Sequence, residues 1–91
     1  MASGDFITLK GIEFEIPNKN NFRKWDYREW NEGKKKFKSY WLDTYEKDSC
    51  GIGIHSYQII SENGSKFYLD DKKLRGEEVD IAKVIFKELG I

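Results

Sequence analysis

Glycine-containing turn motifs divide the first two-thirds of the sequence into short segments of β-strand character. Lys10-Gly11 separates the apolar segment FITL from the run IEFEI at residues 12–16, in which apolar and acidic side chains alternate. Alternation with a period of two is typical of a half-buried strand, and the glycine between the runs predicts a hairpin. Pro17, the only proline, lacks an amide hydrogen and is expected to end the second strand.

Two further turn motifs follow along the chain. The segment WNEGK contains Asn31 and Gly33, and the segment SENGSK contains Asn63-Gly64. Asparagine and glycine are favoured where a tight turn needs a positive φ angle, so each motif predicts a hairpin. A shorter turn at residues 70–71 is expected to return the chain briefly through residues 72–74. The predicted strands of these two hairpins span residues 24–30, 35–45, 52–61 and 66–69.

One segment fits two interpretations. Asn20 or Asn21 could cap a helix over residues 22–31. The strand interpretation is preferred because Trp25 and Tyr27 alternate with charged residues, and aromatic side chains suit a half-buried pleated surface.

The C-terminal segment GEEVDIAKVIFKELGI predicts an amphipathic helix. Glu77 and Glu78 would lie in its positively polarised first turn, and Gly90 is placed to form a left-handed C-cap. Val84 falls outside the apolar face. At 100° per residue, one face collects Val79, Ile81, Ala82, Ile85, Phe86 and Leu89.

These elements predict an α+β fold. Antiparallel hairpins would form a twisted sheet or a small, partly open barrel, and the C-terminal helix would pack on its apolar face. A length of 91 residues predicts a single domain over residues 1–91.

Composition limits the cellular location and the kinds of chemical site that are expected. No apolar run is long enough to cross a bilayer, and the first residues, MASGDFITLK, lack the pattern of a secretory signal, so a cytoplasmic protein without a membrane partner is expected. Cys50 is the only cysteine and His55 the only histidine, which is too few for a protein-only zinc site. Their spacing of five residues spans about 16 Å along an extended chain, which does not favour a catalytic dyad. The chain is therefore expected to be a binding protein without catalytic activity or a cofactor.

The stretch FRKWDYREWNEGKKKFKSYW at residues 22–41 carries the strongest functional signal. It contains seven aromatic residues, including all three tryptophans. Residues 19–41 carry eight basic and three acidic side chains, a local charge of +5 in a chain of net charge zero. The candidate partner-binding residues are Arg23, Trp25, Tyr27, Arg28, Trp30, Lys34, Lys35, Lys36, Lys38, Tyr40 and Trp41.

Four interpretations of this stretch remain open. The aromatic side chains could form the core while the lysines face solvent. Trp, Tyr and Arg also dominate protein interfaces, which leads to the main hypothesis of a small interaction module that binds a protein partner by occlusion or as an adaptor. The alternative is single-stranded nucleic acid, bound by aromatic stacking and lysine contacts to phosphate. Burial of exposed rings by self-association is a weaker possibility.

Overall fold

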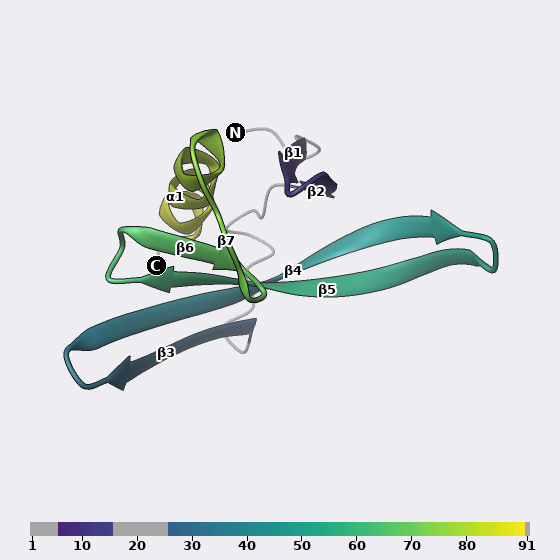
Figure 1. Ribbon diagram of the computed structural model, residues 1–91. Coiled ribbons are helices and arrows are strands. Elements are labelled where there is room, and N and C mark those ends of the chain that lie inside the picture. Colours follow the sequence, from purple (N-terminus) through teal and green to yellow (C-terminus); the bar gives the residue numbers. More distant parts are fainter. Residues whose placement is uncertain (1–5, 16–25, 91) are drawn as a thin grey trace.

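The structure is a computed structural model that describes residues 6–15 and 26–90, except for the side chains of residues 46–48. The described residues form seven strands and, after them, one α-helix (Figure 1). The elements are β1 (Phe6–Leu9), β2 (Ile12–Glu15), β3 (Tyr27–Glu32), β4 (Lys35–Asp48), β5 (Gly51–Glu62), β6 (Lys66–Leu69), β7 (Lys72–Lys73) and α1 (Glu77–Leu89).

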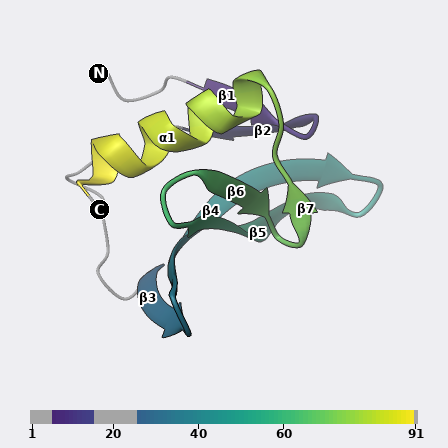
Figure 2. The ribbon, with the colours of Figure 1, turned by 60° about the vertical axis from the view of Figure 1, so that its left-hand side comes forward.

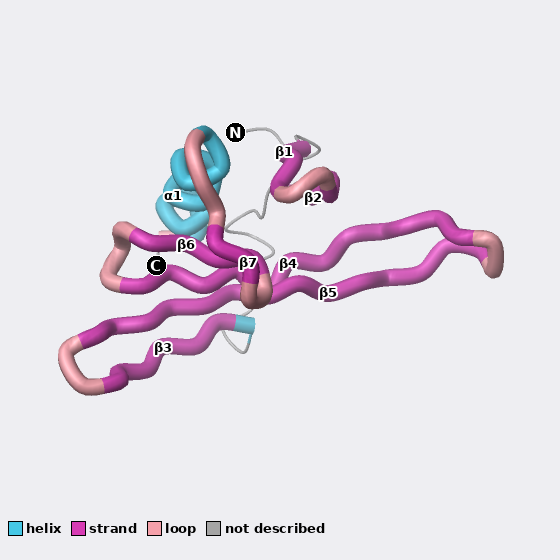
Figure 3. Tube along the Cα trace, viewed as in Figure 1, coloured by secondary structure: helices cyan, strands magenta, loops and turns pink. Residues whose placement is uncertain are grey.

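The predicted α+β class is confirmed, and of the two sheet forms the structure shows the open one. Strands β3 to β7 form a five-stranded antiparallel sheet in sequence order, which is not closed into a barrel. The first hairpin, β1 and β2, is a separate two-stranded sheet and not part of the main one. Figure 3 shows both sheets and α1 along the chain trace.

The turns predicted at Lys10-Gly11, at Asn63-Gly64 and at residues 70–71 are present, whereas the turn of the middle hairpin is shifted. Lys10 and Gly11 have φ angles of 53° and 79°, and Asn63 and Gly64 have φ angles of 55° and 70°. Two consecutive residues with positive φ match the right-handed twist of the flanking strands, which explains why Asn-Gly is favoured there. In the middle hairpin the turn falls at Gly33-Lys34, so β3 extends through Asn31 to Glu32. The ambiguous segment is therefore strand from Tyr27 onward, and residues 22–25 lie outside the described residues.

Strands β4 and β5 are longer than predicted. They form twelve consecutive cross-strand pairs, from Phe37 opposite Glu62 to Asp48 opposite Gly51, and a turn at Ser49 and Cys50 joins them. From the sequence, the first of these strands is predicted to end at Tyr45 and the second to begin at Ile52. Figure 1 shows this hairpin extending well beyond the neighbouring strands, and the molecule is 44 Å long against 27 and 25 Å across.

The core lies on one face of the main sheet. Both α1 and the β1–β2 hairpin cover this face (Figure 2). The rings of Phe67 on β6 and Phe86 on α1 are 5.8 Å apart, and Phe14 on β2 meets Tyr57 on β5 edge to face at 5.4 Å. The buried apolar residues are Leu9, Phe14, Tyr40, Leu42, Ile59, Phe67, Leu69, Leu74, Ala82, Ile85, Phe86 and Leu89.

The helix has the ends that its sequence predicts. Gly90 adopts a left-handed conformation and its amide bonds to the carbonyls of Phe86 and Lys87. At the other end, the Lys10 amide donates to a Glu78 carboxylate oxygen at 2.7 Å, and the Lys10 ammonium lies 3.5 Å from the other oxygen. These bonds tie the first turn of α1 to the β1–β2 turn.

Candidate functional site

The candidate residues are distributed by the alternation of side chains along β3 and β4. Neighbouring residues of a strand point to opposite faces of the sheet, so the aromatic and basic stretch cannot present one common surface. Residues Tyr27, Lys36, Lys38 and Tyr40 share the face that α1 covers, as the cross-strand pairs show. Arg28, Trp30, Lys35 and Trp41 lie on the other face.

The outcome for each candidate differs. Tyr40 is buried in the core, in agreement with the interpretation that the aromatic side chains form the core. Tyr27 is half-buried and packs against the core. Lys34 lies exposed in the turn between β3 and β4. Arg23 and Trp25 lie outside the described residues.

The face of the main sheet opposite α1 is not covered by any described element. On its β4–β5 part it carries four large exposed apolar side chains, which we call the ribbon face: Trp41, Tyr45, Ile52 and Ile54, with 41, 71, 74 and 63% of their surface exposed. Tyr45 lies directly opposite Ile54, and Ile52 and Trp41 follow on the same side of their strands. The four share one side of the outer half of the hairpin, and the polar pair of Asp43 and Ser56 lies between Trp41 and Tyr45.

Hydrogen bonds between polar side chains link β4 and β5 beside the residues of the ribbon face. The Ser56 hydroxyl donates to the Asp43 carboxylate at 2.5 Å, and these two residues are a cross-strand pair between Trp41 and Tyr45. The Gln58 side-chain amide donates to the Ser39 hydroxyl at 3.0 Å, beside Trp41. Asp43 is the only charged side chain among the described residues on this part of the face.

On the opposite side of the same hairpin, the β4 strand is packed as far as Thr44. Leu42 is buried there, and the Thr44 hydroxyl donates to the Glu13 carbonyl oxygen on β2 at 2.6 Å. The first hairpin therefore fixes one side of the β4–β5 hairpin and leaves the ribbon face exposed.

Toward the other end of the uncovered face, Trp30 stacks on Phe37. Their rings are 5.2 Å apart with planes 10° from parallel, and the residues are a cross-strand pair. Both side chains are half-buried. Offset stacking of this kind contributes about 0.5–1.5 kcal/mol beyond area burial, so this pair stabilises the β3–β4 hairpin.

Acidic residues of β3 lie across from the lysines of β4. Glu29 pairs with Lys38 and Glu32 pairs with Lys35. Burial raises the pKa of the Tyr27 hydroxyl, and a hydrogen bond to the Glu29 carboxylate raises it further, so Tyr27 stays a neutral donor at physiological pH. Glu29 and Glu32 therefore compensate part of the local surplus of positive charge along this hairpin.

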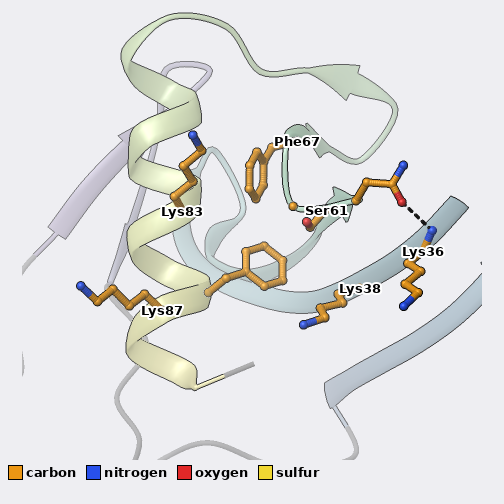
Figure 4. Close-up of a pocket in the computed structure, with 9 residues that line it drawn as sticks. Lys36, Lys38, Ser61, Phe67, Lys83 and Lys87 are labelled. Carbon is orange, nitrogen blue, oxygen red and sulfur yellow. Dashed lines mark hydrogen bonds between the residues drawn. The ribbon is translucent and has the colours of Figure 1, made fainter.

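A pocket of about 510 Å³ lies between α1 and the β4–β6 end of the main sheet. Four lysines, two phenylalanines and three small or polar residues line it: Lys36, Lys38, Ser61, Asn63, Gly64, Phe67, Lys83, Phe86 and Lys87. We call it the lysine pocket. Figure 4 shows Lys83 and Lys87 on the helix and Lys36 and Lys38 on the strand across the gap.

The sequence did not predict that Tyr45, Ile52 and Ile54 share the ribbon face. It also did not predict that Lys83 and Lys87 line one pocket with the lysines of β4. Ile52, Ile54 and Tyr45 become neighbours only if a turn is placed at Ser49-Cys50. Lys83 and Lys87 are far in sequence from Lys36, and only the packing of α1 brings them to one pocket. Their shared helix side, four residues apart, was the available signal.

Among residues 6–15 and 26–90, no three His, Cys, Asp or Glu side chains form a group that could hold a metal ion. No described helix is long and apolar enough to cross a membrane. Comparison with models of known protein families, with curated proteins and with solved structures finds no match to this chain.

Proposed function

We propose that the chain is a non-catalytic interaction module whose ribbon face binds a protein partner. The observation that carries this proposal is the exposure of Trp41, Tyr45, Ile52 and Ile54 on one uncovered side of a protruding hairpin. Binding would act by occluding the partner's surface or by linking it to another molecule, without turnover. Of the residues predicted from the sequence, the proposed contact surface retains Trp41. Its other residues lie nearer the tip of the β4–β5 hairpin.

The energetics favour a contact at this face. Covering a large apolar side chain removes about 1.5–3 kcal/mol of unfavourable exposure, and four such residues lie together here. A contiguous exposed apolar surface on a folded protein marks an interaction site or a risk of aggregation. Aromatic residues are enriched among the side chains that dominate binding energy, and Trp41 and Tyr45 provide two.

The chemistry of the ribbon face defines the partner that it fits. The face is apolar, one hairpin wide, and carries Asp43 as its only described charge. Trp41 and Tyr45 are four residues apart, which is about 13 Å along a strand. The partner surface is therefore expected to be a narrow apolar stripe, with a neutral or basic residue near Asp43.

Nucleic acid remains the second candidate, for a specific reason. Trp30 and Trp41 share the uncovered face with Arg28 and Lys35, so rings and cations do occur together there. The half-burial of Trp30 against Phe37 and the position of Glu32 across from Lys35 weaken the case. Fluorescence titration with a single-stranded oligonucleotide at about 0.05 and 0.2 M salt tests it, because phosphate contacts weaken steeply with salt.

A site-specific crosslink tests the main proposal. A photoreactive phenylalanine analogue placed at Tyr45, in the cells that naturally make the chain, is expected to give one discrete adduct with another protein. The same analogue at Lys72, an exposed position on β7, is the control. Adducts of equal yield at both positions, or an adduct with the mass of two copies of this chain, would contradict a separate partner at the ribbon face.

A further inference from the structure

The lysine pocket is built from two pairs of like charges that face each other. Lys83 and Lys87 are one turn apart on α1, and Lys36 and Lys38 are two positions apart on β4, so each pair shares one side of its element. Neighbouring like charges repel each other, and the pocket contains two such lysine pairs. No carboxylate is among the nine lining residues.

None of these four lysines belongs to the ion pairs among the described residues. Those pairs are Lys10 with Glu78 and Lys66 with Glu62. Lys36, Lys83 and Lys87 are exposed, and their long stems leave the ammonium groups free to reorient toward a ligand. A bound anion would therefore gain attraction from both sides of the pocket.

The inner part of the pocket has an apolar floor and a sheet side that is held by hydrogen bonds. The rings of Phe67 and Phe86 form its apolar floor, and both are almost fully buried. The Asn63 side chain accepts a bond from the Lys36 amide at 2.8 Å, and the Asn63 amide donates to the Lys36 carbonyl at 2.8 Å. These bonds lock the β5–β6 turn against β4, which holds the sheet side of the pocket in place.

We propose that the lysine pocket binds a small molecule that carries at least two phosphate groups. The four lysines supply compact point charges, and lysine binds phosphate groups in this way. A volume of about 510 Å³ lies within the range of about 300–1,000 Å³ that is typical of small-molecule sites. The site is separate from the ribbon face and does not depend on its function.

A strand of nucleic acid fits this pocket less well than a small molecule. Polyanion binding uses a basic stripe that follows the backbone over several nucleotides. Here the lysines surround one pocket and do not form such a stripe. The buried positions of Phe67 and Phe86 also leave their faces unavailable for base stacking.

The test titrates the full chain with pyrophosphate, with adenosine diphosphate and with a ten-residue single-stranded oligonucleotide. Calorimetry measures affinity, and amide NMR shifts locate the site. We expect saturable binding of at least one of the two small diphosphates at one site per chain, with shifts concentrated at Ser61, Gly64, Phe67 and Phe86. The Lys36→Gln/Lys83→Gln variant removes one charge from each side of the pocket and is expected to bind about tenfold more weakly or worse.

The Lys72→Gln/Lys73→Gln variant is the matched control, because it makes the same charge change at exposed positions on β7. It is expected to keep the affinity of the unaltered chain. Equal weakening in both variants would reduce the effect to net charge and overturn the proposal. Absence of saturable binding by either diphosphate, or binding of the oligonucleotide alone, would also overturn it. Amide spectra of each variant confirm that it remains folded.

Discussion

Tyr45 and Ile54 lie directly opposite each other on the uncovered side of the β4–β5 hairpin, with 71 and 63% of their surfaces exposed. Directly opposed side chains in an antiparallel pair contact each other, so the two form the centre of the ribbon face. Five residues farther along β5, Ile59 is completely buried on the other side of the sheet. Strand β5 therefore carries one isoleucine that is part of the core, Ile59, and one that lies outside it, Ile54.

This difference predicts unequal effects of the same substitution. Ile54→Ala is expected to change the free energy of unfolding by no more than about 0.5 kcal/mol, because it alters only exposed surface. Ile59→Ala is expected to destabilise the protein by about 2–5 kcal/mol, because it leaves a cavity in the core. Urea unfolding of both variants measures the difference. Equal destabilisation would show that the ribbon face is part of the core.

The packing of α1 on the sheet rests on Phe86, whose ring lies 5.8 Å from that of Phe67. Phe86→Ala is expected to lower the free energy of unfolding by about 3–5 kcal/mol. Val84→Ala, on the exposed side of the same helix, is the control and should have little effect. Thermal unfolding followed by circular dichroism compares the two. If Phe86→Ala melts with the unaltered protein, the helix does not pack as described.

Glu78 makes stability depend on pH. The hydrogen bond from the Lys10 amide, opposed by partial desolvation and aided by the nearby Lys10 charge, holds the pKa of this carboxyl below its usual value. A lowered folded-state pKa contributes stability above the unfolded-state pKa of about 4.3, and this contribution is lost as pH falls through the folded-state pKa. Glu78→Gln is therefore expected to destabilise the protein by about 1 kcal/mol at pH 7 and by less near pH 3.

Glu77→Gln is the matched control for that substitution. It removes the same charge from the same helical turn, but Glu77 is exposed and the bond from Lys10 goes to Glu78. Thermal unfolding at both pH values separates the Lys10 contact from the helix dipole. A constant difference between Glu78→Gln and the unaltered chain from pH 7 to pH 3 would contradict the role of the carboxylate.

Asn63 combines two functions in the β5–β6 turn. Its φ angle is 55°, and its side chain accepts the bond from the Lys36 amide. Asn63→Gly tolerates this φ and removes only the side-chain bond, with an expected loss of about 0.5–1.5 kcal/mol. Asn63→Ala adds the strain of a left-handed residue, about 1–2 kcal/mol. Urea unfolding should rank the unaltered chain above the glycine variant and the alanine variant last; any other order would argue against this account.

The parts of the fold that depend on local chemistry were predictable from the sequence. Asn63-Gly64 and Lys10-Gly11 required turns, and the apolar stripe with Gly90 at its end required a helix. The turn at Ser49-Cys50 was not predicted because it lacks the Asn-Gly signature, although Gly51 there has a φ of 128°. Missing it shortened the hairpin and hid the pairing of Tyr45 with Ile54.

The candidate site was only partly predictable, because it depends on which face each side chain occupies. The aromatic and basic composition of residues 22–41 was evident, but alternation divides Lys36 and Lys38 from Trp30 and Trp41. The lysine pocket also needs the packing of a helix more than forty residues farther along the chain. Packing over such distances is not encoded in any local pattern of spacing.

The most direct test of the central claim is the affinity of Ile54→Ala for the protein isolated through the Tyr45 crosslink. Val84→Ala is the matched control, because Val84 is an exposed aliphatic residue on α1, away from the ribbon face. Calorimetric titration is expected to show binding about tenfold weaker, or about 1.4 kcal/mol, for Ile54→Ala and unchanged for Val84→Ala. Unchanged affinity for Ile54→Ala, or equal losses in both variants, would contradict binding through the ribbon face.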